Sequence, residues 1–437
     1  MRTSQVLLSI TIVLGVLSLA SCVGELGAGD DSGGDGDGEV GDGSGGGDGD
    51  GSGGGDGGGG GDGETCVPVT LEPQCTASWY GDQECDPANN LAECEWDGGD
   101  CCESTCTGAD CGSYGYECRD PAAGGGGMPV PALIGQPCVD ATDPFAPEHL
   151  LDEVTLLASD DLAGRRPGSV GDLTARRYIE EKFRCFGLTP AMDGCYQQPF
   201  NDGDGGQTGN VLGTIQGSDP SVADEIIVIG GHHDHLGIDG GEIYNGANDN
   251  ASGTVGVLAV ADFMRRQTVA PRRTILFATF GSEEPGLEGS IFYAAHPPAA
   301  FPMAKVVYMI NLDMLGTYDD ADAGNSVDGF GTFAGTPGRD LLDAILEDHP
   351  DFVVNKGKAS EEEDSDFDPF CAAGIPYVYF ATEDACWHEP CDDAARMDYE
   401  HMSEILVVTK DILLGLANSD LDLSTVRDEV GCSRQND

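Results

Sequence analysis

Positive charge is scarce in this chain. Its 437 residues carry 20 Lys and Arg against 78 Asp and Glu, a formal net charge of -58 at pH 7. A surface this acidic repels phosphate backbones and anionic lipid headgroups, which argues against nucleic-acid binding and against membrane docking through basic patches. Aromatic residues make up only 7% of the chain, which contains 67 glycines. We therefore expect that part of the chain does not belong to a folded domain.

Long apolar runs are also lacking. The run at residues 6–19 is too short to span a bilayer comfortably, and we interpret it as the core of a signal peptide. It ends in Leu19-Ala20-Ser21-Cys22, which resembles the signal box of bacterial lipoproteins. The resemblance implies removal of residues 1–21, lipidation of Cys22, and an extracytoplasmic protein anchored to a membrane or the cell surface. An ordinary cleaved signal is the alternative.

Three further segments have no capacity to build a core. Residues 22–64 are mostly Gly, Asp and Ser, which predicts a flexible, self-repelling tether. Residues 121–140, rich in Pro and Gly, predict a second linker, and residues 427–437 a C-terminal tail. We therefore expect folded structure in residues 65–120 and 141–426.

Seventeen cysteines indicate an oxidising compartment, and they are densest in residues 65–120. The stretch CDPANNLAECEWDGGDCC there resembles the Notch-type cysteine-rich repeat, in which disulfides and a calcium ion replace a core. The resemblance implies calcium ligation by Asp97 and Asp100, with carboxylate oxygens suited to a hard cation. The chain lacks the cysteine that the repeat has near Ala88 or Asn89, and a plain disulfide knot is the alternative.

Residues 141–426 alternate between two kinds of periodicity. Short apolar runs predict buried strands at 226–229, 274–280, 305–310 and 377–380. Helical spacing predicts helices at 173–186, 252–266, 339–347 and 399–416. This alternation predicts an α/β domain with a mainly parallel mixed sheet and helices on both faces.

Potential metal ligands follow each predicted strand. The segments are, in order, GGHHDHLG, GSEEPGLEGS, NLDMLG and CWHEPCDD, and NGANDNASG precedes the helix at 252–266. Because the carboxyl ends of parallel strands meet at one edge of a sheet, we expect these segments to share a crevice. Donors of His, Asp and Glu type suit a catalytic zinc, and their number exceeds what one open zinc site uses. The sequence therefore predicts two zinc ions sharing a carboxylate.

These segments resemble the dizinc aminopeptidase family, which includes bacterial leucyl aminopeptidases, aminopeptidase Y and glutamate carboxypeptidase. The resemblance begins near residue 157, in LASDDLAGRRPGS, and extends to the C-terminal helix. It implies a zinc-exopeptidase fold, peptide substrates and a pair of zinc ions. The implied ligands are His232 and Asp313 on one zinc, Glu284 and His388 on the other, and Asp249 bridging both.

The resemblance also implies catalytic roles. Glu283 is the expected general base, and Asp234 is expected to hydrogen-bond the imidazole of His232 and fix its tautomer. A cis peptide bond is implied between Asp249 and Asn250. Two positions depart from the family: Trp387 stands where a tyrosine often helps to hold the oxyanion, and Phe367 where relatives often carry histidine.

The remaining histidines have no companion motif. We expect no metal ligation by His233 or His235 and structural roles for His149, His296, His349 and His401. Cys386 and Cys391 bracket His388 and can form a small disulfide, with zinc ligation by these thiols as the alternative. Cys185 and Cys195 can pair likewise, and elimination leaves Cys371 with Cys432.

The sequence as a whole predicts a lipid-anchored, monomeric metallo-aminopeptidase that hydrolyses N-terminal residues of peptides. One alternative is a glutaminyl-cyclase-like acyltransferase on the same fold, which would use one zinc. Another is a catalytically inactive calcium- or protein-binding surface lipoprotein. The complete set of five ligands, together with Glu283, favours hydrolysis.

Overall fold

The computed structural model describes residues 81, 83, 97–108, 111, 123, 142–203, 206–316, 326–331, 337–357, 364–382 and 385–423. The expected signal peptide, tether and C-terminal tail lie outside the described residues, as does nearly all of the second linker. The domain boundaries given above therefore remain predictions.

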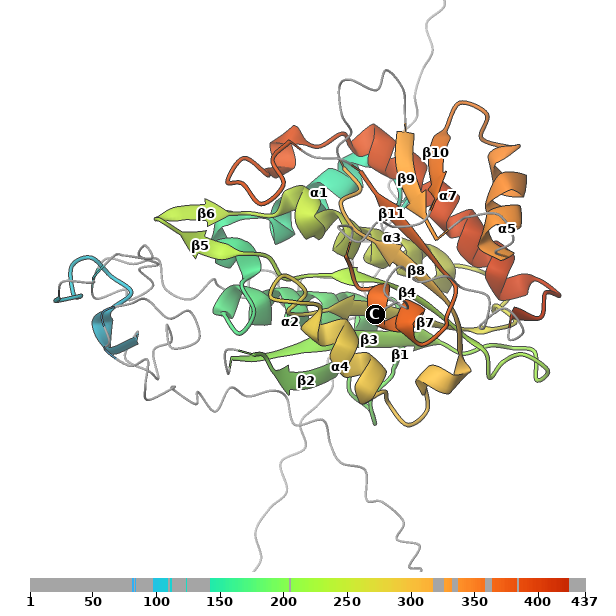
Figure 1. The fold of residues 1–437 in the computed structure, drawn as a ribbon, viewed down its shortest axis with the longest axis horizontal. Helices are drawn as coiled ribbons and strands as arrows, with labels where there is room; N and C mark the ends of the chain where they lie inside the picture. The colour runs from blue at the N-terminus through green and yellow to red at the C-terminus, as the bar shows by residue number, and fades with distance from the viewer. Residues whose placement is uncertain are drawn as a thin grey trace, which may run out of the picture. The chain divides into compact units, whose positions relative to one another are not determined.

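A nine-stranded mixed sheet organises residues 142–423 (Figure 1). Its strand order is β1-β3-β7-β4-β8-β11-β9-β10, and β2 pairs with β3 outside this path. The strands are β1 Thr189–Pro190, β2 Gln197–Asn201, β3 Gln207–Ile215, β4 Ile226–His232, β7 Thr274–Phe280, β8 Val306–Leu312, β9 Ser326–Phe330, β10 Val353–Gly357 and β11 Tyr377–Ala381. A separate two-stranded sheet consists of β5 Gly237–Asp239 and β6 Glu242–Tyr244.

The centre of the sheet is parallel. Strand β4 pairs in parallel with β7 on one side and with β8 on the other, and β8 pairs in parallel with β11. Antiparallel pairs flank this centre, where β3 meets β7 and β9 meets β11. The four parallel strands therefore direct their carboxyl ends toward the same edge of the sheet.

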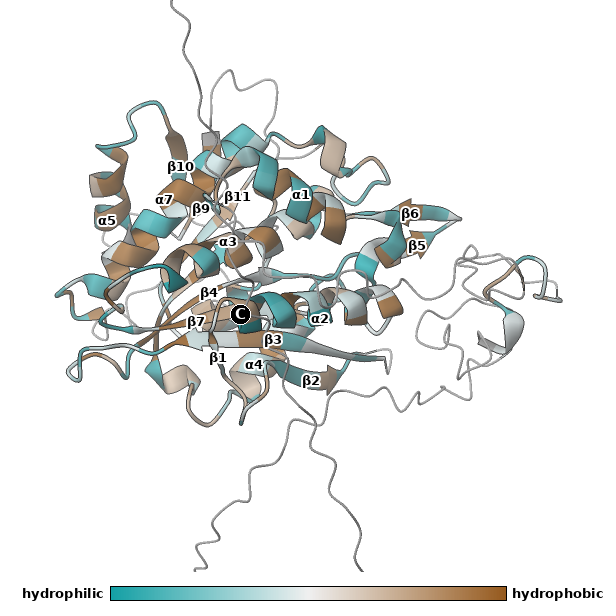
Figure 2. Cartoon of the chain, turned by 180° about the vertical axis from the view of Figure 1, so that it is seen from behind, coloured by the Kyte–Doolittle hydropathy of each residue, from teal (hydrophilic) through white to brown (hydrophobic). Residues whose placement is uncertain are grey.

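Alternate side chains of the central strands enter two different cores. In β4, Ile227 and Ile229 pack in one hydrophobic cluster, whereas Ile226 and Val228 pack in the other. Because side chains alternate along a strand, the two clusters lie on opposite faces of the sheet. This explains why the central strands are apolar throughout, which Figure 2 shows as brown ribbons in the middle of the fold.

Helices cover both faces. The larger cluster contains side chains of α1 Pro147–Leu157, α2 Val170–Cys185, α3 Gly253–Arg265, α5 Pro337–Leu346 and α7 Tyr399–Asn418. The smaller cluster contains side chains of α4 Glu288–Ala295 and α6 Asp368–Ala372. Helix α2 begins where the Ser169 side chain accepts a hydrogen bond from the Asp172 amide, and α7 begins where Asp398 caps the His401 amide.

The expected fold class is confirmed. The four expected strands correspond to β4, β7, β8 and β11, and the four expected helices to α2, α3, α5 and α7. Five strands of the large sheet, the β5–β6 hairpin and helices α1, α4 and α6 were not expected. Within the described residues, no helix combines the length and apolar character that crossing a bilayer requires.

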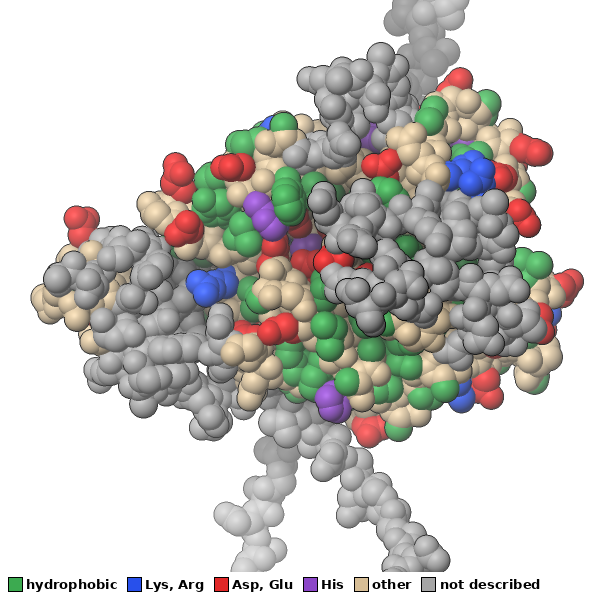
Figure 3. Space-filling model, in the orientation of Figure 1, with side chains coloured by type: hydrophobic (Ala, Val, Ile, Leu, Met, Phe, Trp, Pro, Cys, Tyr) green, Lys and Arg blue, Asp and Glu red, His purple; other side chains and the backbone are tan. Residues whose placement is uncertain are grey.

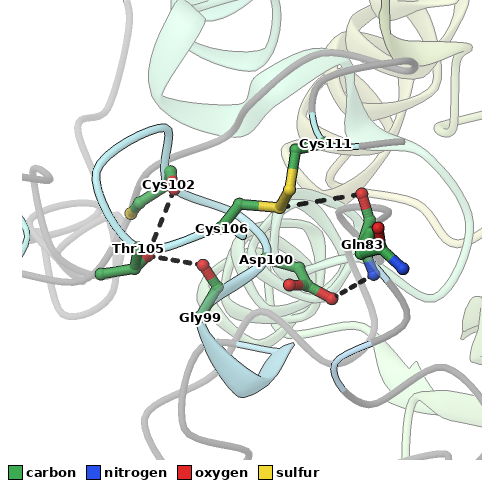
Figure 4. Close-up of a disulfide and its surroundings, with 7 residues drawn as sticks. All are labelled: Gln83, Gly99, Asp100, Cys102, Thr105, Cys106 and Cys111. Carbon is green, nitrogen blue, oxygen red and sulfur yellow. Dashed lines mark hydrogen bonds between the residues drawn. A yellow bond between two sulfur atoms is a disulfide. The ribbon is translucent and has the colours of Figure 1, made fainter. Parts of the chain in front are cut away.

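The described part of the cysteine-rich segment is a tight loop closed by a disulfide between Cys106 and Cys111 (Figure 4). Its turn is held by hydrogen bonds from the Thr105 hydroxyl to the carbonyls of Gly99 and Cys102. The buried carboxylate of Asp100 accepts a hydrogen bond from the Gln83 amide, with 2.6 Å between N and Oδ2. Calcium ligation by Asp97 and Asp100 stays a prediction.

Candidate metal centre

The expected ligands come together at the carboxyl ends of the parallel strands. His232 is the last residue of β4, Asp313 follows β8 directly, and Glu284 lies in the loop after β7. His388 lies in the loop beyond β11, and Asp249 in the segment before α3. Histidine and acidic side chains gather near the middle of the face seen in Figure 3. The topology thus converts five separate sequence segments into one site.

Asp249 lies between the two histidines. Its Oδ1 is 3.2 Å from His232 Nε2, and its Oδ2 is 3.3 Å from His388 Nε2. Each carboxylate oxygen therefore faces a different histidine, which is the arrangement expected of a bridging ligand. The peptide bond between Asp249 and Asn250 is cis, as the resemblance implies.

A further carboxylate completes each half of the site. His232 Nε2 is 3.3 Å from Asp313 Oδ1, and His388 Nε2 is 3.0 Å from Glu284 Oε2. An imidazole nitrogen carries at most one proton and cannot donate it well to two carboxylates at once. Ligand atoms about 2.0–2.1 Å from a shared tetrahedral zinc lie about 3.3 Å apart, so these spacings fit cations better than hydrogen bonds.

One buried acceptor also points to a cation. Asp313 Oδ1 accepts no hydrogen bond from a described residue, while Oδ2 accepts one from the Ser365 hydroxyl at 2.7 Å. A buried carboxylate oxygen without a donor is costly unless an ion compensates it. Two groups of described side chains could each hold a metal, namely His232, Asp249 and Glu284, and His232, Glu283 and Asp313.

Burial and crowding of acidic groups shape the titration of the site. Burial raises the pKa of Glu283 well above its usual range, and the neighbouring Asp313 adds to this. Although burial opposes charge on His388, Asp249 and Glu284 raise the pKa of that imidazole to about 10. The site thus carries an excess of negative charge that favours bound protons or cations.

The Asp234 carboxylate bonds differently from the expectation. Its Oδ1 is 3.8 Å from His232 Nδ1, and the Asp234 main-chain carbonyl is closer, at 3.3 Å. The carboxylate instead accepts the amides of Glu283 at 3.1 Å and Glu284 at 3.3 Å. A proton on His232 Nδ1 donated to this carbonyl leaves Nε2 as the ligand atom, so Asp234 still supports the expected tautomer.

The other histidines take different positions. His233 turns away from the site, and its Nε2 is 3.2 Å from Asp172 Oδ1. His235 is fully buried, and its Nδ1 is 2.5 Å from Glu284 Oε1, so it contacts an expected ligand from behind. Cys386 and Cys391 form the expected disulfide around His388. Cys185, Cys195 and Cys371 are disulfide-bonded as well.

Trp387 lies at the surface beside the site. Its side chain is 57% exposed, and its indole stacks on the His388 ring with 4.2 Å between centroids. Phe367 is instead buried between the rings of Tyr377 and Tyr379. The first departure thus lies at an exposed position against the His388 ring, and the second lies in the hydrophobic core.

Three supporting residues escaped the sequence analysis. Arg165 is buried, and its guanidinium donates to the carbonyls of Leu157, His233, Asn245 and Gly246. The Nδ2 of Asn250 donates to the carbonyl of Leu312, which links the segment that carries Asp249 to the last residue of β8. Asp392 accepts the amides of Asn248 and Asp249. These residues hold the loops that carry the ligands, and only their burial in the folded chain distinguishes them.

The mixed α/β fold of this chain is similar to that of solved aminopeptidases. It superposes on the aminopeptidase from Aneurinibacillus sp. strain AM-1 with a TM-score of 0.52 at 19% identity, covering 63% of this chain and 95% of that one. It superposes on BSAP, a zinc aminopeptidase from Bacillus subtilis, with a TM-score of 0.52 at 14% identity, covering 67% and 100%.

Sequence comparison finds two matching family profiles. Residues 210–412 match the profile of peptidase family M28, and residues 64–101 match that of the Notch LNR domain. The chain is therefore similar to peptidase family M28 over the first of these segments and to the LNR domain over the second.

Characterised relatives are similar over part of their length. Leupeptin-inactivating enzyme 1 of Streptomyces exfoliatus is 26% identical over 304 residues, which are 62% of this chain and 62% of that protein. Aminopeptidase Y of Saccharomyces cerevisiae is 26% identical over 210 residues, which are 44% and 36%. The chain thus spans between about one third and two thirds of the length of these relatives.

Proposed function

We propose that this chain is a metallo-aminopeptidase that removes N-terminal residues from peptides with the help of two zinc ions. The observation that carries the proposal is the position of Asp249, with one carboxylate oxygen 3.2 Å from His232 Nε2 and the other 3.3 Å from His388 Nε2. The name of one similar protein, aminopeptidase Y, supports the same reaction class.

The proposed division of ligands follows the contacts. His232 and Asp313 would hold one ion, Glu284 and His388 the other, and Asp249 both. When bound, such a pair of ions would lower the pKa of a water towards neutrality and polarise the substrate carbonyl.

Glu283 is the proposed general base. It lies in the loop after β7, next to Glu284 in the sequence. Its Oε2 is 3.9 Å from His232 Nε2, and it forms a candidate metal-binding group with His232 and Asp313. Its carboxylate would accept a proton from the attacking water and deliver it to the departing amine. The hydroxyl of the water thereby joins the new carboxyl group, and its proton joins the released amine. Asp234 would hold the Glu283 main chain through the amide hydrogen bond described above.

Hydrolysis of leucine p-nitroanilide tests the reaction. The wild-type protein should release p-nitroaniline, whereas the N-acetylated substrate should not react because its N-terminal amine is blocked. Equal turnover of the two substrates would reject the aminopeptidase assignment. Release of a cyclised product from a glutaminyl substrate, without hydrolysis of the leucine substrate, would favour the acyltransferase alternative.

Glu283→Gln tests the base. This variant should retain its zinc and lose about 10²–10⁴-fold in kcat, which is the usual contribution of general acid–base catalysis. The matched control is Glu242→Gln, on the exposed end of β6, which should keep wild-type activity. A Glu283→Gln protein as active as this control would remove the assignment of Glu283.

We also propose the location expected from the sequence, with the chain tethered outside the cytoplasm through lipid on Cys22. The order Leu19-Ala20-Ser21-Cys22 and the disulfides Cys106–Cys111 and Cys386–Cys391 support this proposal. Metabolic labelling with a fatty acid should mark the wild-type protein and leave Cys22→Ser unlabelled. Equal labelling of both would contradict it.

A further inference from the structure

One residue, Asp392, accepts hydrogen bonds from the three consecutive main-chain amides that end at Asp249. The Asp392 carboxylate accepts the amide of Asn248 at 2.8 Å through Oδ1 and that of Asp249 at 2.9 Å through Oδ2. The Asp392 main-chain carbonyl accepts the amide of Ala247 at 3.4 Å. A residue 143 positions along the chain therefore fixes the main chain on which Asp249 is carried.

All of these groups are buried. Asp392 is 1% exposed, Ala247 and Asn248 are 0% exposed, and Asp249 is 4% exposed. Buried amides without acceptors are costly, and a carboxylate supplies two acceptor oxygens for two neighbouring donors. An asparagine here would offer one oxygen and would direct its own N–H₂ group at the second amide, so the position is specific for a carboxylate.

The loop that carries Asp392 also contacts the side chain of Asp249. His388, four residues before Asp392, has its Nε2 3.3 Å from Asp249 Oδ2. The disulfide between Cys386 and Cys391 encloses His388 and ends directly before Asp392. One short cross-linked loop thus holds the main chain of Asp249 through Asp392 and meets its carboxylate through His388.

We propose that Asp392 is the positioning residue that orients Asp249 to bridge two metal ions. This inference rests on the proposed two-metal function, because it concerns the same carboxylate. Asp392 itself bonds the peptide amides rather than the ligand atoms. With the amides of Asn248 and Asp249 fixed, the Asp249 carboxylate is held with one oxygen toward each histidine.

Asp392→Asn tests the proposal, with Asp393→Asn as the matched control. Asp393 is exposed, and one oxygen of its carboxylate caps the Ala395 amide at 2.9 Å. The control therefore makes the same substitution and removes the same charge one residue away, while an asparagine oxygen can still cap Ala395. Zinc dissociation constants are measured by competition with a chelating dye. The visible absorption of the Co²⁺-loaded protein reports ligand geometry independently of activity.

The wild type and Asp393→Asn should bind zinc equally and give the same Co²⁺ spectrum. Asp392→Asn should bind zinc about 10–100-fold more weakly, as is usual when the partner of a metal ligand is lost, and its Co²⁺ spectrum should change. Asp392→Glu, which keeps both acceptor oxygens, should recover part of the affinity. Asp392→Asn with wild-type affinity and spectrum would overturn the assignment.

Two further outcomes are informative. If Asp392→Asn does not fold, Asp392→Glu carries the test, because it displaces the carboxylate by one methylene and should still alter the Co²⁺ spectrum; an unaltered spectrum would overturn the assignment. A wild-type protein that binds neither zinc nor Co²⁺ would overturn the proposed function itself. The failure of the positioning role and that of the metal site are thus distinguishable.

Discussion

The imidazole of His235 supports the carboxylate of Glu284 from within the protein, with 2.5 Å between Nδ1 and Oε1. The other oxygen of Glu284 faces His388 Nε2 at 3.0 Å. The two histidines thus contact opposite oxygens of the Glu284 carboxylate. The buried His235 fixes the orientation of this carboxylate, so that its second oxygen faces the proposed metal. This contact leads to the first prediction.

His235→Leu should weaken zinc binding about 10–100-fold, because Glu284 loses the hydrogen bond that orients it. His235→Asn should retain most of the affinity, since an asparagine amide can place a donor close to the position of Nδ1. His349→Leu, at a half-buried site beside Asp411, is the control and should bind zinc as the wild type does. Equal zinc affinity of all four proteins in a dye-competition titration would contradict this role.

A second prediction concerns the buried ion pair between Asp172 and Arg176 on α2. Their closest atoms, Oδ1 and Nε, are 3.1 Å apart, and both side chains are at most 1% exposed. Asp172→Asn leaves the Arg176 charge buried, which should lower the free energy of unfolding by about 3–5 kcal/mol. Glu180→Gln breaks the more exposed pair with Arg184 on the same helix and should cost less than about 1 kcal/mol in urea denaturation.

The same pair has a predicted pH dependence. Although burial opposes its ionisation, Arg176 and His233 lower the pKa of Asp172 in the folded protein. A lowered pKa means that ionised Asp172 contributes stability above the unfolded value of about 3.9, and this contribution is lost as pH falls through the folded pKa. Between neutral and acid pH, the wild type should therefore lose more unfolding free energy than Asp172→Asn. Parallel losses would refute this role of the pair.

A third prediction concerns the disulfide that encloses His388. Replacing Cys386 and Cys391 with serine should cost about 2 kcal/mol of stability for so short a loop and should also loosen the segment that carries His388. Zinc retained after dialysis should therefore fall. The control replaces Cys106 and Cys111, which have the same separation of 5 residues, and should leave zinc retention unchanged. Equal retention in both double variants would show that the cross-link does not support the site.

The central strands and the candidate ligands could be predicted from sequence for related physical reasons. Strands buried on both faces are continuous apolar runs, which the sequence shows plainly. Residues of metal-binding type come shortly after these runs: His232 ends β4 after the run that includes Ile229, and Asp313 comes directly after β8. The side strands lack this signature. Strand β3 contains Thr208 and Asn210 among its buried residues, and Asn210 bonds Gln198 and the Gly289 carbonyl, contacts that depend on tertiary structure.

The supporting residues could not be predicted for a different reason. Arg165 and Arg166 are adjacent in the sequence, and nothing local indicates that the first is buried. Burial lowers the pKa of Arg165 to about 10, and four main-chain carbonyls accept its hydrogen bonds, three of them at least 68 residues away in the sequence. Asp392 and Asp393 present the same difficulty, since only one of them reaches the Asp249 segment. Roles of this kind are properties of the folded chain.

The zinc content of the purified protein tests the account most directly. After dialysis against metal-free buffer, elemental analysis should give about two zinc ions per wild-type chain and a lower content for Asp249→Ala, in which the proposed bridge is absent. Hydrolysis of leucine p-nitroanilide should stop with a chelator and return with added zinc. A wild-type protein that holds no more zinc than Asp249→Ala, yet remains active with the chelator present, would contradict the two-zinc site.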